Sequence, residues 1–264
     1  MRLDSGYRVY AIIRHEIFIT KRSVELFFDT LFFPLMNVIL FGVIGRFLGS
    51  SDSASATYLV MGALLWNVIS INQYNVTVSS MWSVWSHNLT NLFIAPISVA
   101  EYFTAHVLAA ALRTNLVVAL LSLGTYAVFD FNILSMGIVN LLLCVLNLSL
   151  FAWWVGIILL GLIFRYGTRV QALSWGIIFL FQPLTASFFP LDALPSSVRA
   201  IALALPPTHA FEAARDALDQ PGVAWAPMGV SLAMNLAYFG VALILFRLLF
   251  DKSRKTGQFA RNDL

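Results

Sequence analysis

Four histidines are the first residues of this 264-residue chain that could do chemistry. His15, His87, His106 and His209 fall in four separate segments and share no metal-ligand spacing with a cysteine or a carboxylate. The long apolar segments contain no nucleophile elbow and no paired carboxylates within one helical turn. A Gly-x-x-x-x-Gly-Lys-Ser/Thr loop is also missing, as is any Gly-Lys dipeptide. We therefore expect no enzymatic activity, no metal and no cofactor in this chain.

Hydrogen-bonding side chains inside apolar segments form the second candidate set. In segment 57–79 they recur at three- and four-residue steps, which places them on one helix face. Polar side chains are costly in a membrane, so they face the bundle or a wet cavity. They can line a path for a polar or amphipathic substrate, or they can bond helix to helix; both interpretations stay open. The candidate translocation path comprises Asn37, Asn67, Ser70, Tyr74, Thr77, Gln182, Phe188 and Phe189.

Two ionisable residues, Asp29 and Arg113, are nearest to the interiors of the apolar segments. Both are placed towards segment ends, where snorkelling to the interface or mutual pairing would satisfy their charges. A proton relay is the alternative role. Cys144 is the one cysteine, so a disulfide within the chain is excluded.

The composition indicates which elements must position these residues. Hydrophobic residues make up 59% of the chain and charged residues 11%, against roughly a quarter charged in a soluble domain. Most of the surface must therefore face lipid, and we expect a single all-α integral membrane domain over residues 1–264. Six stretches are long enough to cross a bilayer, which takes about 20 apolar residues. They run over approximately 27–48, 57–79, 103–129, 134–163, 171–190 and 227–250.

Proline interrupts two of these expected spans. Pro34 should kink the first, while Pro183 and Pro190 make the fifth short and interrupted. The charged N-terminus has no short apolar core followed by a cleavage site, so we expect the first span to stay in the protein.

Lysine and arginine placement predicts the orientation. They concentrate in the N-terminal arm, in the loop after the fourth span and in the tail 251–264, whereas the opposite loops are poor in them. Both termini should therefore be cytoplasmic in a multi-pass protein of the inner (plasma) membrane. The net charge of +3 follows from this topology and does not indicate nucleic-acid binding.

The segment before the first span, within residues 1–26, has a basic face and an apolar face. Arg8, Arg14 and Lys21 fall on one side of a helix over 8–26, while Ile13 and Ile17 fall on the other. A helix of this kind lies in the membrane interface. A plain continuation of the first span is the alternative.

Two further segments are not spans. Residues 80–100 are helix-compatible to Ile94 and stopped by Pro96, too apolar for a solvated loop and too short to cross. They fit a docking helix for a cytosolic partner, or an interfacial helix lying on lipid. Residues 191–226 contain two short helices with proline stops. Such backbone fits a re-entrant hairpin packed in protein at the outer mouth of a pathway, or an ordinary outer loop.

These two segments, in this order around six spans, resemble the ABC-2 family of exporter permeases. The stretch Leu89–Ser98 is similar to the family's coupling segment, and Phe188–Pro195 with Leu205–His209 to its outer loop. The resemblance covers nearly the whole chain. Segment 79–100 departs from the family in having no charged residue beyond a possible His87. The resemblance assigns ATPase coupling to Trp82, Trp85, His87, Leu89, Leu92, Phe93 and Pro96.

The resemblance implies a second copy of the chain, or a related one, and a separate ATP-binding cassette ATPase that holds ATP and Mg. It further implies export of a glycan, a lipid-linked saccharide or another amphipathic substrate, with drug or lipid efflux as the alternative. Outside the family, an ATP-independent secondary transporter or channel and a membrane enzyme acting on lipid-linked substrates are the rivals.

Overall fold

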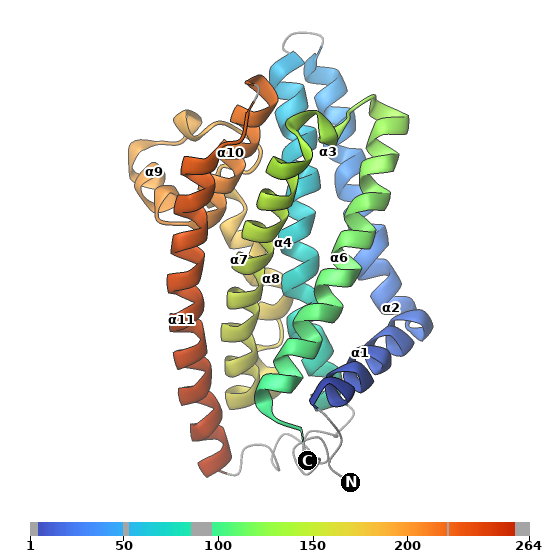
Figure 1. The fold of residues 1–264 in the computed structure, drawn as a ribbon, viewed down its shortest axis with the longest axis vertical. Helices are drawn as coiled ribbons and strands as arrows, with labels where there is room; N and C mark the ends of the chain where they lie inside the picture. Colours follow the sequence, from blue (N-terminus) through green and yellow to red (C-terminus); the bar gives the residue numbers. More distant parts are fainter. Residues whose placement is uncertain (1–4, 50–52, 86–96, 221, 257–264) are drawn as a thin grey trace.

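The computed structural model describes residues 5–49, 53–85, 97–220 and 222–256, and this part of the chain is helical without strands. Its helices form an upright bundle (Figure 1). Five of the described helices are long and apolar enough to cross a membrane. They are the continuous helix Val24–Gly49, α4 (Ser53–Trp85), α6 (Val99–Phe129), α7 (Ile138–Tyr166) and α11 (Trp225–Lys255).

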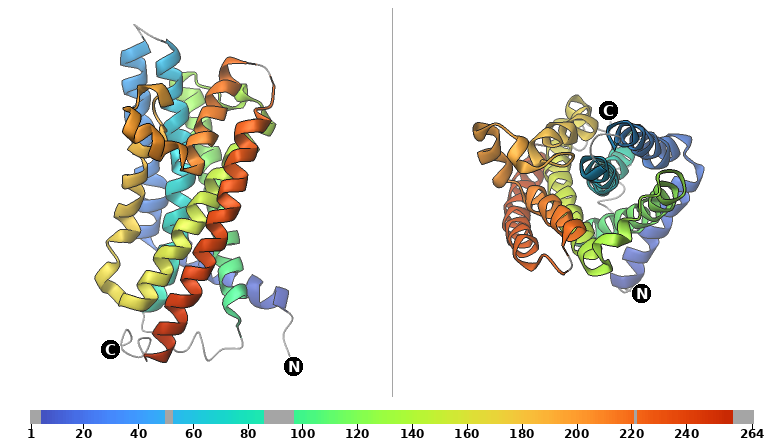
Figure 2. Two further views of the ribbon diagram at one scale, coloured as in Figure 1. Left: turned by 90° about the vertical axis from the view of Figure 1, so that its left-hand side faces the viewer. Right: turned by 90° about the horizontal axis from the view of Figure 1, so that it is seen from above.

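Helix α4 runs through the middle of the bundle (Figure 2, right). Its apolar side chains Met61, Leu64, Leu65, Val68 and Ile69 are fully buried. They form one core with residues of the surrounding helices, among them Phe151 and Leu160 of α7. By contrast, α11 lies on the outside, and only 17% of its apolar window is buried. The polar face predicted on 57–79 therefore lies on the most enclosed helix.

The expected fifth span is much shorter than the other apolar helices. Helix α8 (Leu173–Phe181) continues into the 3-10 turn η4 (Pro183–Thr185), and together they extend about 20 Å. The helix stops there because Pro183 has no N–H to donate. Ala186 then turns the chain with a left-handed backbone (φ 50°). The described residues thus contain five long helices and one short apolar helix where the sequence predicted six spans.

The N-terminal amphipathic segment is a separate helix. Helix α1 (Ser5–Arg22) lies obliquely across the lower end of the bundle in Figure 1, the end at which α11 also finishes. It ends because Ser23 leaves the helical region and its Oγ accepts a hydrogen bond from the N–H of Leu26 (3.2 Å), which caps α2 (Val24–Phe27). Residues 8–26 are therefore two helices. Arg14 and Lys21 are exposed as expected.

The first long helix contains a π-helical turn. Between α2 and α3 (Phe33–Gly49), residues Phe28–Phe32 form η1, and the N–H of Phe33 bonds to the carbonyl of Phe28, five residues back. Pro34 follows immediately, and a proline ring clashes with the carbonyl four residues before it. The irregularity that was expected as a kink at Pro34 is therefore a wider, π-helical turn just before this proline.

Two short helices fold back between α8 and α11. Helix α9 (Ser196–Leu203) lies at the side of the bundle, and α10 (Pro206–Asp219) packs against α7 and α11 (Figure 1). Both helices were expected from the proline stops, because Pro206 and Pro207 occupy the first turn of α10, where no N–H is needed.

Candidate functional site

Part of the polar face of α4 lines a cavity of about 320 Å³ between α4, the first long helix and α8. That volume is in the range of small-molecule sites. Its polar wall comes from Asn37, Asn67, Ser70, Gln73, Tyr74, Asp29 and Ser174, and its apolar wall includes Phe33, Trp66, Trp175, Ile178 and Phe179. We call this space the central pocket. It combines hydrogen-bonding groups with aromatic surfaces.

The central pocket brings together four of the eight predicted path residues, namely Asn37, Asn67, Ser70 and Tyr74. Thr77 is fully buried beneath it and bonds to the carbonyl of Gln73 (3.0 Å). The other three lie elsewhere.

Gln182, Phe188 and Phe189 follow α8 and do not line the central pocket. The carbonyl of Gln182 accepts a bond from Ser187 Oγ (3.1 Å), and the Phe188 ring stacks on Phe41 with centroids 4.3 Å apart. These three residues therefore follow the end of α8 and lie outside the central pocket.

Asn37 and Tyr74 supply the pocket with different kinds of polar group. Asn37 Oδ1 is buried and accepts no hydrogen bond from the described residues. An unmet buried acceptor costs free energy, on the order of 1–3 kcal/mol, until a donor reaches it. The hydroxyl of Tyr74, in contrast, donates to Asp29 Oδ2, so α4 is tied to the π-helical turn. Asn37 is thus a group in the wall that is left to bond a ligand.

The neighbouring amides of α4 bond to other helices. Asn72 donates to Ser149 Oγ (3.0 Å) and accepts from Trp153 Nε1 (3.0 Å), both on α7. Gln73 donates to the carbonyl of Ser174 on α8 (3.2 Å). Some of these polar residues therefore line the pocket, Asn72 bonds to another helix, and Gln73 and Tyr74 do both.

Arg113 is held in a buried network at the lower part of the bundle. One guanidinium nitrogen donates to Asn75 Oδ1 (2.7 Å), and another donates to the carboxylate (2.9 Å) and the backbone carbonyl (2.8 Å) of Glu16. The pairing of Asp29 with Arg113 offered from the sequence is therefore wrong. Asp29 bonds to Tyr74, and Arg113 joins α1, α4 and α6.

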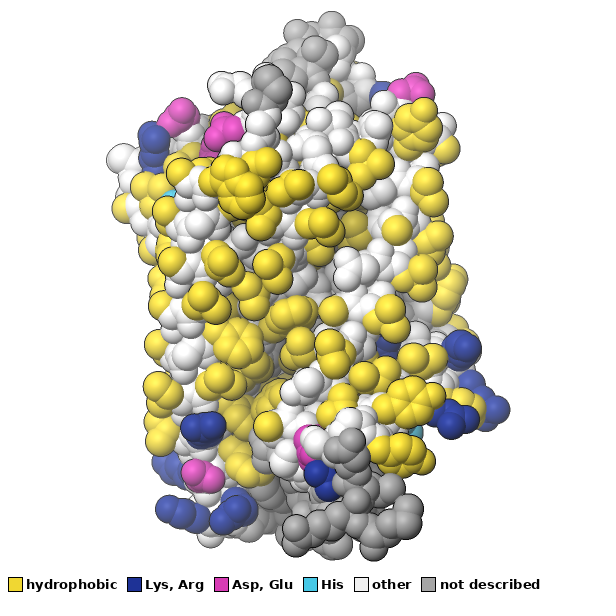
Figure 3. Space-filling view, viewed as in Figure 1, with side chains coloured by type: hydrophobic (Ala, Val, Ile, Leu, Met, Phe, Trp, Pro, Cys, Tyr) yellow, Lys and Arg dark blue, Asp and Glu magenta, His cyan; other side chains and the backbone are white. Residues whose placement is uncertain are grey.

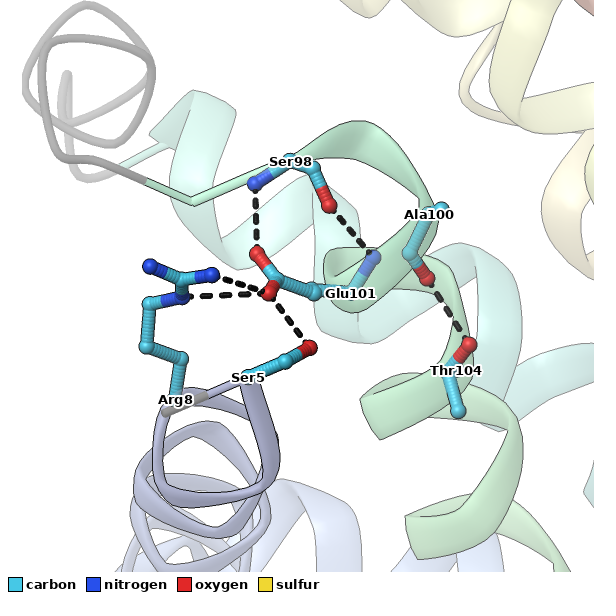
Figure 4. A network of polar contacts seen from close by, with 6 residues as sticks. All are labelled: Ser5, Arg8, Ser98, Ala100, Glu101 and Thr104. Carbon is cyan, nitrogen blue, oxygen red and sulfur yellow. Dashed lines mark hydrogen bonds and ion pairs between the residues drawn. The ribbon is translucent and has the colours of Figure 1, made fainter. Parts of the chain in front are cut away.

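A second polar joint connects α1 to the start of α6 (Figure 4). Ser98 caps α6 by accepting from the N–H of Glu101, and Glu101 accepts in return from the N–H of Ser98 (2.8 Å). The Glu101 carboxylate also accepts from Ser5 Oγ (2.6 Å) and from Arg8 Nη2 (2.6 Å). Arg8, expected on a solvent-facing basic side, is instead part of this joint. We call it the Glu101 joint.

Most of the predicted coupling residues lie outside the described residues, namely His87, Leu89, Leu92, Phe93 and Pro96, as does the side chain of Trp82. Trp85 is described and ends α4. Its Nε1 donates to Gln171 (3.2 Å), and its ring stacks on Trp175 of α8 with centroids 6.4 Å apart. Because Trp175 also lines the central pocket, the end of α4 contacts the pocket wall directly.

At the other end, the turn between α9 and α10 is satisfied by side chains. The carbonyl of Ala202 accepts from Thr208 Oγ1 (2.7 Å), that of Ala204 from Tyr238 Oη (2.8 Å) and that of Pro206 from Ser231 Oγ (2.9 Å). His209, considered as a possible reactive group, contacts the carbonyl of Leu203 (3.0 Å). Tyr238 lies about 20 Å along α11 from its first residue. The turn therefore lies beside the middle part of α11, below the upper end of that helix.

Four residues of these sites were missed from the sequence. Glu16 sits in a basic, apparently amphipathic helix, where nothing in the spacing marks it as buried. Trp175 and Ser174 belong to an apolar run whose periodicity does not reveal the pocket face. Glu101 carries a readable signal, since Ser98 followed by Glu three residues later is a capping box.

The comparison with protein families agrees with this architecture. The family model of the ABC-2 type transporter matches residues 7–218, from α1 through the central pocket into α10. No curated protein matches the chain. The match covers most of the sequence, and the described helices are those of a multi-pass membrane protein. The chain is a membrane permease of ABC type and belongs to the ABC-2 type transporter family.

Proposed function

We propose that this permease exports an amphipathic substrate, a glycan or a lipid-linked saccharide, in a transporter driven by a separate ATPase. The observation that carries the proposal is the central pocket, with its unmet amide oxygen on Asn37 beside the rings of Trp66 and Trp175. Sugars offer hydroxyl donors at their edges and C–H faces that pack on aromatic rings. A pocket with both kinds of surface suits such a substrate better than it suits a purely apolar substrate.

The lower end of the bundle is the cytoplasmic end in this proposal. Arg14, Lys21, Lys252 and Lys255 are exposed there, as the excess of basic residues on the cytoplasmic side requires. The turn between α9 and α10 would then be a re-entrant hairpin at the outer mouth. Its bonded carbonyls support this placement, because backbone at membrane depth needs partners within the protein.

The ATPase would act on the segment between α4 and α6. Segment 86–96 leaves α4 after Trp85 and returns at the Glu101 joint, so a push on it reaches the pocket wall through Trp85 and Trp175. The energy would come from the different affinities of the two ATPase states for nucleotide. Two copies of the chain would face each other across the pathway.

The first test is purification of the tagged chain in mild detergent, with mass spectrometry and ATPase assay of the eluate. We expect a stoichiometric ATP-binding subunit that is lost from Leu92→Asp and Phe93→Asp variants. A matched control is Leu134→Asp in the exposed 3-10 turn η2 (Ile133–Met136), which adds the same charge outside the long helices and away from the coupling segment. A complex that survives both coupling variants, or a chain that never co-purifies with an ATPase, contradicts the coupling model.

The second test concerns the substrate. Inverted vesicles containing the assembled transporter are given ATP and a fluorescent lipid-linked oligosaccharide in the outside medium, or a cationic dye of the kind drug exporters carry. We expect ATP-dependent uptake of the oligosaccharide that falls several-fold in Asn37→Leu. Asn115→Leu is the matched control, because Asn115 bonds only within its own exposed helix turn. Uptake of the dye alone would identify drug efflux instead, and uptake without ATP a secondary transporter.

A further inference from the structure

A second hollow lies between α6 and α11, on the outer surface of the lower half of the bundle. Its volume is about 720 Å³, and its walls include Phe103 and Thr104 of α6, Ile157 of α7, and Phe239, Phe246 and Phe250 of α11. It shares no residue with the central pocket. We call it the α6–α11 groove. Since α11 is mostly unburied and the chain is a membrane protein, this groove faces the hydrocarbon of the bilayer.

The lower end of the groove carries a net positive charge. Arg247 and Arg254 line it, with Asp251 between them. Neither arginine forms an ion pair with a carboxylate of the described residues, Asp251 included. Exposed Lys252 and Lys255 flank them, and basic side chains gather over the lower end of α11 (Figure 3). The groove is thus apolar over most of its length and cationic at its lower end.

The length of the groove matches one leaflet of a bilayer. From Phe239 to Arg254 it follows α11 for about 22 Å. Half of a bilayer, from the midplane through the headgroups, measures about 20–22 Å. An acyl chain against the phenylalanine rings would therefore place a phosphate between Arg247 and Arg254.

We propose that the α6–α11 groove is a specific binding site for an anionic phospholipid of the leaflet at the lower end of the bundle. Guanidinium groups bind phosphate through charge-assisted hydrogen bonds, and basic pockets between membrane helices select anionic headgroups. Asp251 works against a second negative charge, so a headgroup with one net negative charge, such as phosphatidylglycerol, fits best. The site holds a lipid cofactor and is separate from the path of the exported substrate.

The test uses the full-length protein in detergent, mixed with equal amounts of phosphatidylglycerol and phosphatidylcholine of the same acyl chains. Native mass spectrometry then measures the lipid retained. We expect phosphatidylglycerol to be retained preferentially. In the Arg247→Gln/Arg254→Gln variant, the ratio of retained phosphatidylglycerol to phosphatidylcholine should fall about tenfold. Lys252→Gln/Lys255→Gln removes the same charge from the same helix end outside the groove and should behave as the unaltered protein.

A charge-neutral variant checks the groove itself. Thr104→Trp fills the groove beside Phe103 and should lower retention of phosphatidylglycerol without changing any charge, and it decides the question if the arginine variant does not fold. Equal retention of the two lipids by the unaltered protein would overturn the proposal, as would full retention by Thr104→Trp. A high yield of disulfide-linked dimer from Leu243→Cys would assign the groove to a second copy of the chain and would also overturn it.

Discussion

At the scale of single residues, the buried side chain of Arg113 bonds α6 to both α1 and α4. It is 8% exposed, and its carboxylate partner Glu16 is 4% exposed. A buried ion pair of this kind adds little net stability, but removing one partner leaves the other charge buried without the ion pair that balances it. The pair therefore fixes the position of α1 more than it strengthens the fold.

We expect Arg113→Met to lower the free energy of unfolding by roughly 3–5 kcal/mol, because Glu16 and the Asn75 oxygen lose the hydrogen bonds that Arg113 donates. Heating the purified protein and measuring the soluble fraction by size-exclusion chromatography would show the loss. The variant Glu16→Leu/Arg113→Met removes both charges and should recover most of it. A double variant as unstable as the single one would contradict this account.

The sequence identifies some of these residues and misses others for a physical reason. Asn67, Ser70 and Tyr74 could be placed on one face because the period of a helix is fixed. Glu16 could not be predicted as buried, because the arginine that satisfies it lies on α6, far along the chain. For the same reason, the mutual pairing of Asp29 and Arg113, offered beside snorkelling, could not be tested from the sequence: in space their partners are Tyr74 and Glu16.

At the scale of elements, the close approach of segment 186–188 to α4 depends on Gly62. A Cβ atom at position 62 would lie 2.2 Å from the carbonyl oxygen of Ser187 and 3.3 Å from the ring of Phe188. The obstacle is backbone, which cannot rotate away as a side chain can. The segment after α8 can therefore lie this close to α4 only because residue 62 has no side chain.

We expect Gly62→Ala to lower the free energy of unfolding by roughly 1–3 kcal/mol and to displace segment 186–188 from α4. Gly124→Ala is the matched control: it meets no atom within 4 Å, and alanine favours a helix by about 0.5–1 kcal/mol over glycine. Thermal unfolding in detergent measures both changes. A Gly62→Ala protein as stable as the control variant would show that the segment is loosely held.

The Glu101 joint supports an expectation about α1. Ser98→Ala removes the side-chain cap of α6, worth about 0.5–2 kcal/mol. It also loosens the first turn of α6, which carries the Glu101 side chain that holds Ser5 and Arg8. We expect faster hydrogen exchange in α1 and in the first turn of α6, measured by mass spectrometry. Thr104→Val, which loses a hydroxyl bond within α6 only, should leave α1 unchanged; equal exchange in both variants would contradict the joint.

A helix boundary can be predicted from the sequence when the residues that cause it are next to it in the chain. The long helices could be predicted because a run of apolar residues is readable from the sequence alone, although α4 continues to Trp85, six residues beyond the expected end. The short α8 was drawn too long because Phe188 and Phe189 extend the apolar run past Pro183. Only the left-handed turn at Ala186 shows that the helix has ended.

At the scale of the whole molecule, the orientation can be tested with single cysteines. Cys144 is buried, so a reagent that labels exposed thiols should leave it unmodified. We expect Gln220→Cys, at the upper end, to react with an impermeant maleimide in intact cells. Lys255→Cys, at the lower end, should react only after the membrane is opened, because basic residues stay on the cytoplasmic side. The reverse pattern would invert the proposed direction of transport.

The π-helical turn at Phe28–Phe32 sets the direction in which side chains before and after it point along the first long helix. A turn of this kind holds one residue more than an α-helical turn, so it acts as a stored insertion. Deleting that residue would rotate everything before it by about 100° relative to everything after it. Asp29, which now meets Tyr74, and Asn37, which faces the same pocket, would then point in different directions. The pocket thus depends on the number of residues in this turn as well as on their identity. Deleting one residue here would turn Asp29 and Asn37 away from each other, although the composition of the helix would hardly change.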